Sequence, residues 1–155
     1  MRLATLVLFG AAAFAQKYTG PRPPKPDVPY LLHATKLIEL DTGNAKEEQK
    51  KDDTIYTIPG ATAQARTPMP EPIFLMTSEK IQADRMTLWR LNVKGGAREL
   101  VMSKKQRRDG PRPIRVNATK VADGLYKIEA QEFCENGEYC LSPEGSNQVF
   151  CFSVY

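Results

Sequence analysis

Apolar and polar residues alternate along many short segments of this chain, and turn residues separate those segments. The clearest example is residues 87–93, whose alternate positions place on one face Trp89, Leu91 and Val93. A period of two is the pattern of a half-buried β-strand. Gly95 and Gly96 supply a turn, and residues 97–102 after it have further apolar positions that fit a second strand. The two segments therefore predict a β-hairpin.

The C-terminal part of the chain repeats this pattern. Apolar and polar residues alternate over residues 114–121, Asp123 and Gly124 are typical turn residues, and residues 125–130 alternate again as a second strand. Residues 148–155 close the chain with aromatic residues at alternate positions. Large apolar side chains at such positions are the ones that strands bury. We expect the core to contain Trp89, Leu91, Tyr126, Ile128, Phe150, Phe152 and Val154.

Roughly seven to nine short strands follow one another at about 10-residue spacing, which is typical of an antiparallel sandwich or barrel. The sequence therefore predicts an all-β fold, an antiparallel β-sandwich of immunoglobulin-like or similar topology. Three segments of the first half are less regular. Residues 30–40 fit either a strand or a helix, residues 45–53 are expected to form a solvated loop, and residues 78–86 are the best helical candidate.

The N-terminus predicts export. Arg2 precedes an apolar run that ends in Ala13, Phe14 and Ala15, the pattern of a signal peptide with its cleavage site. The run is shorter than the roughly 20 residues that span a bilayer as a helix, although an uncleaved anchor remains the alternative. We expect a signal peptide at residues 1–15, a Pro-rich spacer at residues 16–29 and one β-sandwich domain at residues 30–155. The mature chain has no other segment apolar enough to cross a membrane, so a secreted or periplasmic location is expected.

Positive charge is concentrated in one stretch. The chain has 22 basic and 18 acidic residues, yet residues 103–115 contain one acid, Asp109, and six basic residues: Lys104, Lys105, Arg107, Arg108, Arg112 and Arg115. The stretch lies between two predicted strands and is expected to form a long hairpin loop. It is either a solvated loop or the contact for an anionic surface polymer, a phospholipid head group or an envelope protein. It has no aromatic residues on which bases could stack, so we expect no nucleic-acid partner.

The sequence offers little catalytic or metal-binding chemistry. His33 is the only histidine and lies in an apolar run, and no serine stands in a G-x-S-x-G motif. Glu132, Glu135 and Glu138 are scattered carboxylates that a solvated face explains. The cysteines lack the C-x-x-C spacing of zinc sites. We expect no enzymatic activity, no metal and no cofactor.

Three cysteines lie near the C-terminus, at Cys134, Cys140 and Cys151. In an exported protein this number predicts one disulfide and one free thiol. Cys140 and Cys151 belong to adjacent strands of the final predicted hairpin and can lie opposite each other, so we favour this pairing. A bond between Cys134 and Cys140 remains the alternative.

Residues 136–155, with a G-E-Y strand, a Gly-Ser turn and an F-x-F strand, resemble the closing hairpin of small exported bacterial β-proteins. The resemblance covers about 20 residues; it implies an all-β fold and no active site. Together with the predicted export, it favours a non-enzymatic binding or structural module of the bacterial cell envelope, which contacts an anionic partner through the basic stretch. The alternative is a small secreted hydrolase or a protease inhibitor, with residues 67–72 or the basic stretch as the inhibitory loop.

Overall fold

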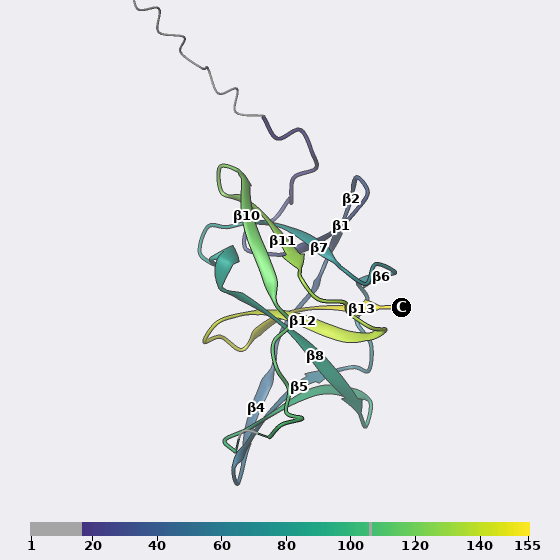
Figure 1. The fold of residues 1–155 in the computed structure, drawn as a ribbon, viewed down its shortest axis with the longest axis vertical. Coiled ribbons are helices and arrows are strands. Elements are labelled where there is room, and N and C mark those ends of the chain that lie inside the picture. Colours follow the sequence, from purple (N-terminus) through teal and green to yellow (C-terminus); the bar gives the residue numbers. More distant parts are fainter. Residues whose placement is uncertain (1–16, 106) are drawn as a thin grey trace, which may run out of the picture.

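The computed structural model describes residues 17–105 and 107–155 (Figure 1). The predicted signal peptide lies outside the described residues. Within them the chain forms thirteen strands and one short 3-10 helix, η1 (Ala83–Arg85). The all-β prediction is confirmed. The strands outnumber the seven to nine expected, because residues 30–59 alone fold into five of them.

Five strands form the first sheet, in which all neighbours are antiparallel. Figure 1 shows it in the upper half of the molecule. In order across the sheet the strands are β10 (Val116–Ala122), β11 (Leu125–Ala130), β7 (Ile73–Thr77), β1 (Tyr30–His33) and β2 (Lys36–Glu39).

Eight strands form the second sheet, whose main path is antiparallel. In order the strands are β3 (Asp41–Asn44), β13 (Gln148–Val154), β12 (Gly137–Pro143), β8 (Met86–Lys94), β9 (Ala97–Ser103), β5 (Asp53–Pro59) and β4 (Lys46–Lys50). The eighth strand, β6 (Arg66–Thr67), pairs with β13 in parallel.

The second sheet curls into a half-barrel because its two outer strands are consecutive parts of the chain. β3 pairs with β13 at one end of the sheet, β4 pairs with β5 at the other, and only Ala45 separates β3 from β4. The backbone N–H of the buried Ala45 donates to the carbonyl oxygen of Asn147 at 2.8 Å. The bend at Ala45 therefore brings the two ends of the sheet toward each other and leaves few unpaired edges.

The larger core lies between the two sheets. Phe74 of β7 contacts Phe152 of β13 edge-on, with ring centroids 5.1 Å apart, and Tyr139 stacks on the other side of Phe152 at 5.6 Å. Phe150, Phe152, Val154 and Ile128 are buried here as predicted, and the half-buried Tyr126 packs against them.

A smaller core of apolar side chains lines the concave face of the half-barrel. Leu91 is buried there as predicted, whereas Trp89 is half-buried. Val93 follows them on β8 but is 55 % exposed, because the strand runs past the end of this core. Since the smaller core covers the other face of β12 and β13, these two strands are buried on both sides.

Two expectations for the first half of the chain are wrong. Residues 46–50 form the strand β4 and not a loop, because backbone hydrogen bonds to β5 hold a segment whose side chains are all polar. Residues 78–85 contain only the three-residue η1, and Met86 already begins β8. The N–H groups of Glu79, Lys80 and Ile81 all donate to the carboxylate of Asp27, which holds this segment as a loop.

That same contact docks the end of the Pro-rich segment onto the domain. The backbone N–H of Asp27 donates to the carbonyl oxygen of Thr77 at 2.7 Å, and Pro26 forms an isolated bridge with Thr77. Burial of Asp27 acts to raise the pKa of its carboxyl group. The hydrogen bonds from Ile81, Glu79 and Lys80 outweigh burial and hold that pKa below its ordinary value.

Candidate functional site

The concave face of the half-barrel holds an open cavity of about 480 Å³. Six strands contribute its walls, because alternate residues of each strand point to the inside of the curl. Tyr56 on β5 lies opposite Leu100 on β9, and Trp89 on β8 lies opposite Cys140 on β12. The remaining apolar wall residues are Ala45, Ile58, Leu91, Met102 and Val149.

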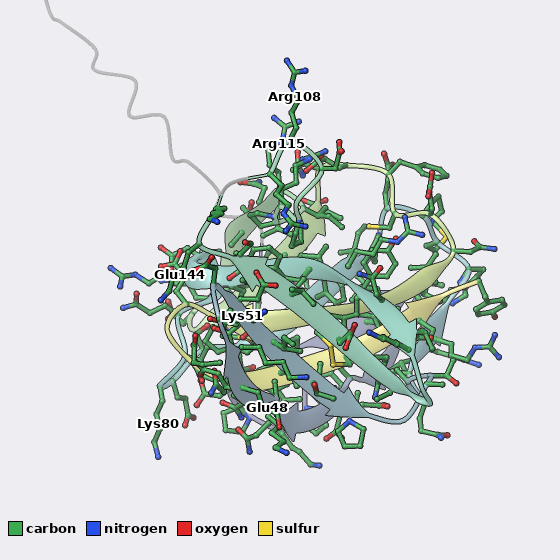
Figure 2. The ribbon with its side chains drawn as sticks, turned by 90° about the horizontal axis from the view of Figure 1, so that it is seen from below. Glu48, Lys51, Lys80, Arg108, Arg115 and Glu144 are labelled. Carbon is green, nitrogen blue, oxygen red and sulfur yellow. A yellow bond between two sulfur atoms is a disulfide. The ribbon has the colours of Figure 1, made fainter. Side chains whose placement is uncertain are left out.

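A disulfide between Cys140 and Cys151 links two neighbouring strands of the wall, β12 and β13. The two residues are directly paired on β12 and β13, with Cα atoms 4.1 Å apart. The favoured pairing is therefore confirmed. Figure 2 shows the bond as a yellow link within the half-barrel. Cys134 is the free cysteine; burial raises the pKa of its thiol to about 11, so the thiol stays protonated at neutral pH and is a poor nucleophile.

The mouth of the cavity lies at the turn between β12 and β13, and polar residues surround it. The side-chain amide of Asn147 donates to Oε2 of Glu47 on β4 at 3.0 Å, which ties this turn to the edge of the half-barrel. Ser142 Oγ donates to the carbonyl oxygen of Gln148 at 2.8 Å. Gly145, which has a φ of 71°, allows the turn its left-handed backbone. Glu144 also lines the mouth.

Two charged residues lie on the concave face beyond the residues that line the cavity: Arg98 pairs with Ile58, and Glu138 pairs with Leu91. Arg98 on β9 and Glu138 on β12 are only 4 % and 5 % exposed, and Arg98 Nη1 lies 3.8 Å from Glu138 Oε2. Arg98 also donates to the carbonyl oxygens of Gly60 and Pro59, both at 2.9 Å. Hydropathy assigns both residues to the surface, so their position was not predicted.

The carboxylate of Glu138 accepts further hydrogen bonds. Its Oε1 accepts from Ser153 Oγ at 2.6 Å, and its Oε2 accepts from the backbone N–H of Ala63 at 3.0 Å. Together with the contacts of Arg98, these bonds anchor residues 59–63 across the end of the half-barrel.

The basic stretch singled out in the sequence runs from one sheet to the other. β9 and β10 belong to different sheets, so residues 103–115 cross between sheets and do not form the expected hairpin loop. Each strand has other partners: β9 pairs with β5 and β8, and β10 pairs with β11.

Glu132 holds the far end of the basic stretch. It accepts from the side chain of Arg112 at 2.9 Å and from the backbone N–H of Arg115 at 2.7 Å. The Arg115 N–H and, after it, the Arg112 side chain hold the pKa of Glu132 below its ordinary value. At the near end, Lys104, Arg107 and Arg108 are exposed. Figure 2 shows Arg108 extending away from the ribbon beyond Arg115.

The near end of the stretch lies beside the β4–β5 turn. The backbone N–H of Lys104 donates to the carbonyl oxygen of Asp52 at 2.9 Å, and Lys105 Nζ lies 3.5 Å from an Asp52 carboxylate oxygen. A surface hollow of about 520 Å³ between the two loops is lined by Lys50, Lys51, Asp52, Asp53, Ser103, Lys105 and Arg107. Lys50 and Lys51 belong to this surface and were not predicted, because they are far from the basic stretch in sequence.

The other candidate groups lie apart from the cavity. His33 is exposed at the end of β1. Glu135 pairs with Arg90 at 2.8 Å, whereas Glu132 and Glu138 have the separate partners described above. Within residues 17–105 and 107–155, no three His, Cys, Asp or Glu side chains gather as metal ligands. Over the same residues no helix has the length and apolar character to cross a membrane.

Comparisons with protein-family models, with curated proteins and with solved structures gave no match. The resemblance of residues 136–155 to small exported bacterial β-proteins stays a prediction.

Proposed function

We propose that the protein is an exported, non-enzymatic binding module of the bacterial cell envelope, and that it holds a small, largely apolar ligand inside the half-barrel. The observation that carries this proposal is the cavity of about 480 Å³ with apolar walls and a polar mouth. Cavities of about 300–1,000 Å³ lined by apolar and aromatic side chains are the usual sites for small molecules.

Three fixed contacts support a preformed site. The Cys140–Cys151 disulfide holds the wall, Arg98 and Glu138 pair on the concave face beyond the cavity, and Asn147 bonds to Glu47 at the mouth. A site that is already ordered loses little conformational entropy when a ligand enters, and this favours affinity. The ordered walls therefore favour a ligand-binding role over that of a structural spacer.

Trp89 provides a direct test, because it is the only tryptophan of the chain and lines the cavity. Titration with decanol should shift the Trp89 emission and saturate. Val149→Phe places a ring into the cavity and should abolish the shift, whereas Val93→Phe on the exposed end of β8 should leave it unchanged. An unshifted emission in the native protein, or equal binding by Val149→Phe, would contradict the proposal.

A second contact, with an anionic surface polymer, is supported by the surface that joins the β4–β5 turn to the basic stretch. Lys50, Lys51, Lys104, Arg107 and Arg108 are all exposed there. Exposed cations on adjacent loops attract polyanions in a salt-dependent way. This surface is separate from the cavity, so the two proposals can be tested independently.

A column of immobilised heparin tests this second contact. Changing Lys51 and Arg107 to Gln, one residue from each loop, should lower the salt concentration at which the protein elutes. The matched control changes Arg112 and Arg115, whose charges Glu132 already offsets, and should have a smaller effect. Equal losses from the two variants would show that only net charge matters and would overturn this site.

A further inference from the structure

The charged residues that line the cavity are both acidic. Glu47 and Glu144 stand at the mouth, and among the described residues no Lys, Arg or His lines the cavity. We propose that the ligand is a cationic amphiphile, with its apolar chain inside the half-barrel and its positive group between these two carboxylates. This inference rests on the proposed function of the half-barrel as a ligand site.

The two carboxylates come from elements that are held together. Glu47 faces the inside of β4 because it pairs with Tyr56, which also lines the cavity. Glu144 belongs to the β12–β13 turn, and Asn147 of that turn donates to Glu47. Two linked elements therefore place the carboxylates of Glu47 and Glu144 at the same cavity.

The nearest basic side chain on β4 is engaged on the other face of the strand. Lys46 Nζ lies 2.9 Å from Glu48 Oε1, and both residues are exposed. Since neighbouring residues of a strand point to opposite faces, this pair lies outside the half-barrel. It therefore leaves the negative charge of Glu47 in place at the mouth.

Three hydrogen-bond donors at the mouth are already engaged, which disfavours an anionic ligand. Ser142 donates to Gln148, Thr87 donates to the carbonyl oxygen of Ser142 at 3.1 Å, and Asn147 donates to Glu47. Carboxylates, in contrast, accept several hydrogen bonds each. The mouth thus offers acceptors to an ammonium group, and the faces of Trp89 and Tyr56 attract cations as well.

The test compares three probes that share one chain and differ in the charge of the head: decylammonium, decanol and decanoate. Each is titrated below its micellar concentration at low salt, and Trp89 emission reports binding. Decylammonium should bind at least about threefold more tightly than decanol, as expected for two exposed ion pairs, and decanoate most weakly. The advantage over decanol should shrink as salt is added.

Two variants assign the effect to the named carboxylates. Joint Glu47→Gln and Glu144→Gln substitutions should remove the preference for decylammonium over decanol. Glu48→Gln, on the outer face of the same strand, should keep the preference. If decanol or decanoate binds as tightly as decylammonium, the charge assignment is wrong and the half-barrel site stands. If none of the three probes changes Trp89 emission, the half-barrel site itself is wrong.

Discussion

The side-chain amide of Asn147 donates a 3.0 Å hydrogen bond to Glu47, a residue 100 positions earlier in the chain. Beside it, the backbone N–H of Ala45 donates to the carbonyl oxygen of Asn147. These two bonds join the β12–β13 turn to the bend between β3 and β4. They therefore hold the two ends of the curled sheet together beside the cavity mouth.

Asn147→Ala should loosen the mouth. The substitution removes the bond to Glu47 but keeps the backbone bond to Ala45, so we expect a loss of about 0.5–1.5 kcal/mol of unfolding free energy. Hydrogen exchange at the Ala45 amide should become faster, and a bound decyl probe should dissociate faster. Asn92→Ala, at an exposed position on β8, is the control. Unchanged exchange at Ala45 in the Asn147 variant would show that the bond does not hold the mouth.

Reduction of the Cys140–Cys151 disulfide should destabilise the protein. The bonded residues are 11 positions apart, and closing a loop of about this length stabilises a fold by about 3 kcal/mol. Urea unfolding with and without reductant, followed by Trp89 emission, measures the difference. A Cys134→Ala background removes thiol exchange from the comparison. Equal midpoints under the two conditions would contradict a stabilising role.

Arg98 and Glu138 should depend on each other. Removing one partner of a buried pair leaves the other charge without compensation and costs about 3–5 kcal/mol. We expect Arg98→Met or Glu138→Gln alone to lower the unfolding free energy by about that amount, and the double variant by clearly less than the two losses combined. A double-mutant cycle in urea measures the coupling. Additive losses would mean that the two residues stabilise the end of the half-barrel independently.

Asp27 should contribute a stability that depends on pH. Its carboxyl pKa is lowered in the folded protein, because the hydrogen bonds from residues 79–81 outweigh the effect of burial. A lowered pKa gives a contribution that is complete above the ordinary value of 3.8 and disappears as pH falls through the folded value. Native protein should therefore be more stable than Asp27→Asn at pH 7, and the difference should vanish toward pH 2. A constant difference over this range would contradict the contribution of the carboxylate.

Local pattern predicted the C-terminal half of the fold well. In residues 148–154 the alternation of large apolar side chains identifies the face that packs on Phe74, and it places Cys151 on the opposite face. The same reasoning on β12 brings Cys140 opposite Cys151, so the disulfide followed from the strand register.

The half-barrel and its cavity could not be predicted in this way. β4 consists of Lys, Glu and Gln, so no alternation of apolar and polar residues reveals that its backbone pairs with β5. The burial of Arg98 and Glu138 depends on their ion pair and on hydrogen bonds to backbone groups of residues 59–63. The cavity itself needs residues from six strands, and no local segment contains its pattern.

The half-barrel as a ligand site is tested most directly by contact between a ligand and Trp89. Decanol brominated at its terminal carbon quenches indole emission only when bromine approaches the ring closely, and its head carries no charge. The native protein should show saturable quenching that unbrominated decanol competes away and that Val149→Phe abolishes. If Trp89 emission is unaffected by the brominated chain, or is quenched equally in Val149→Phe, the half-barrel does not bind the ligand.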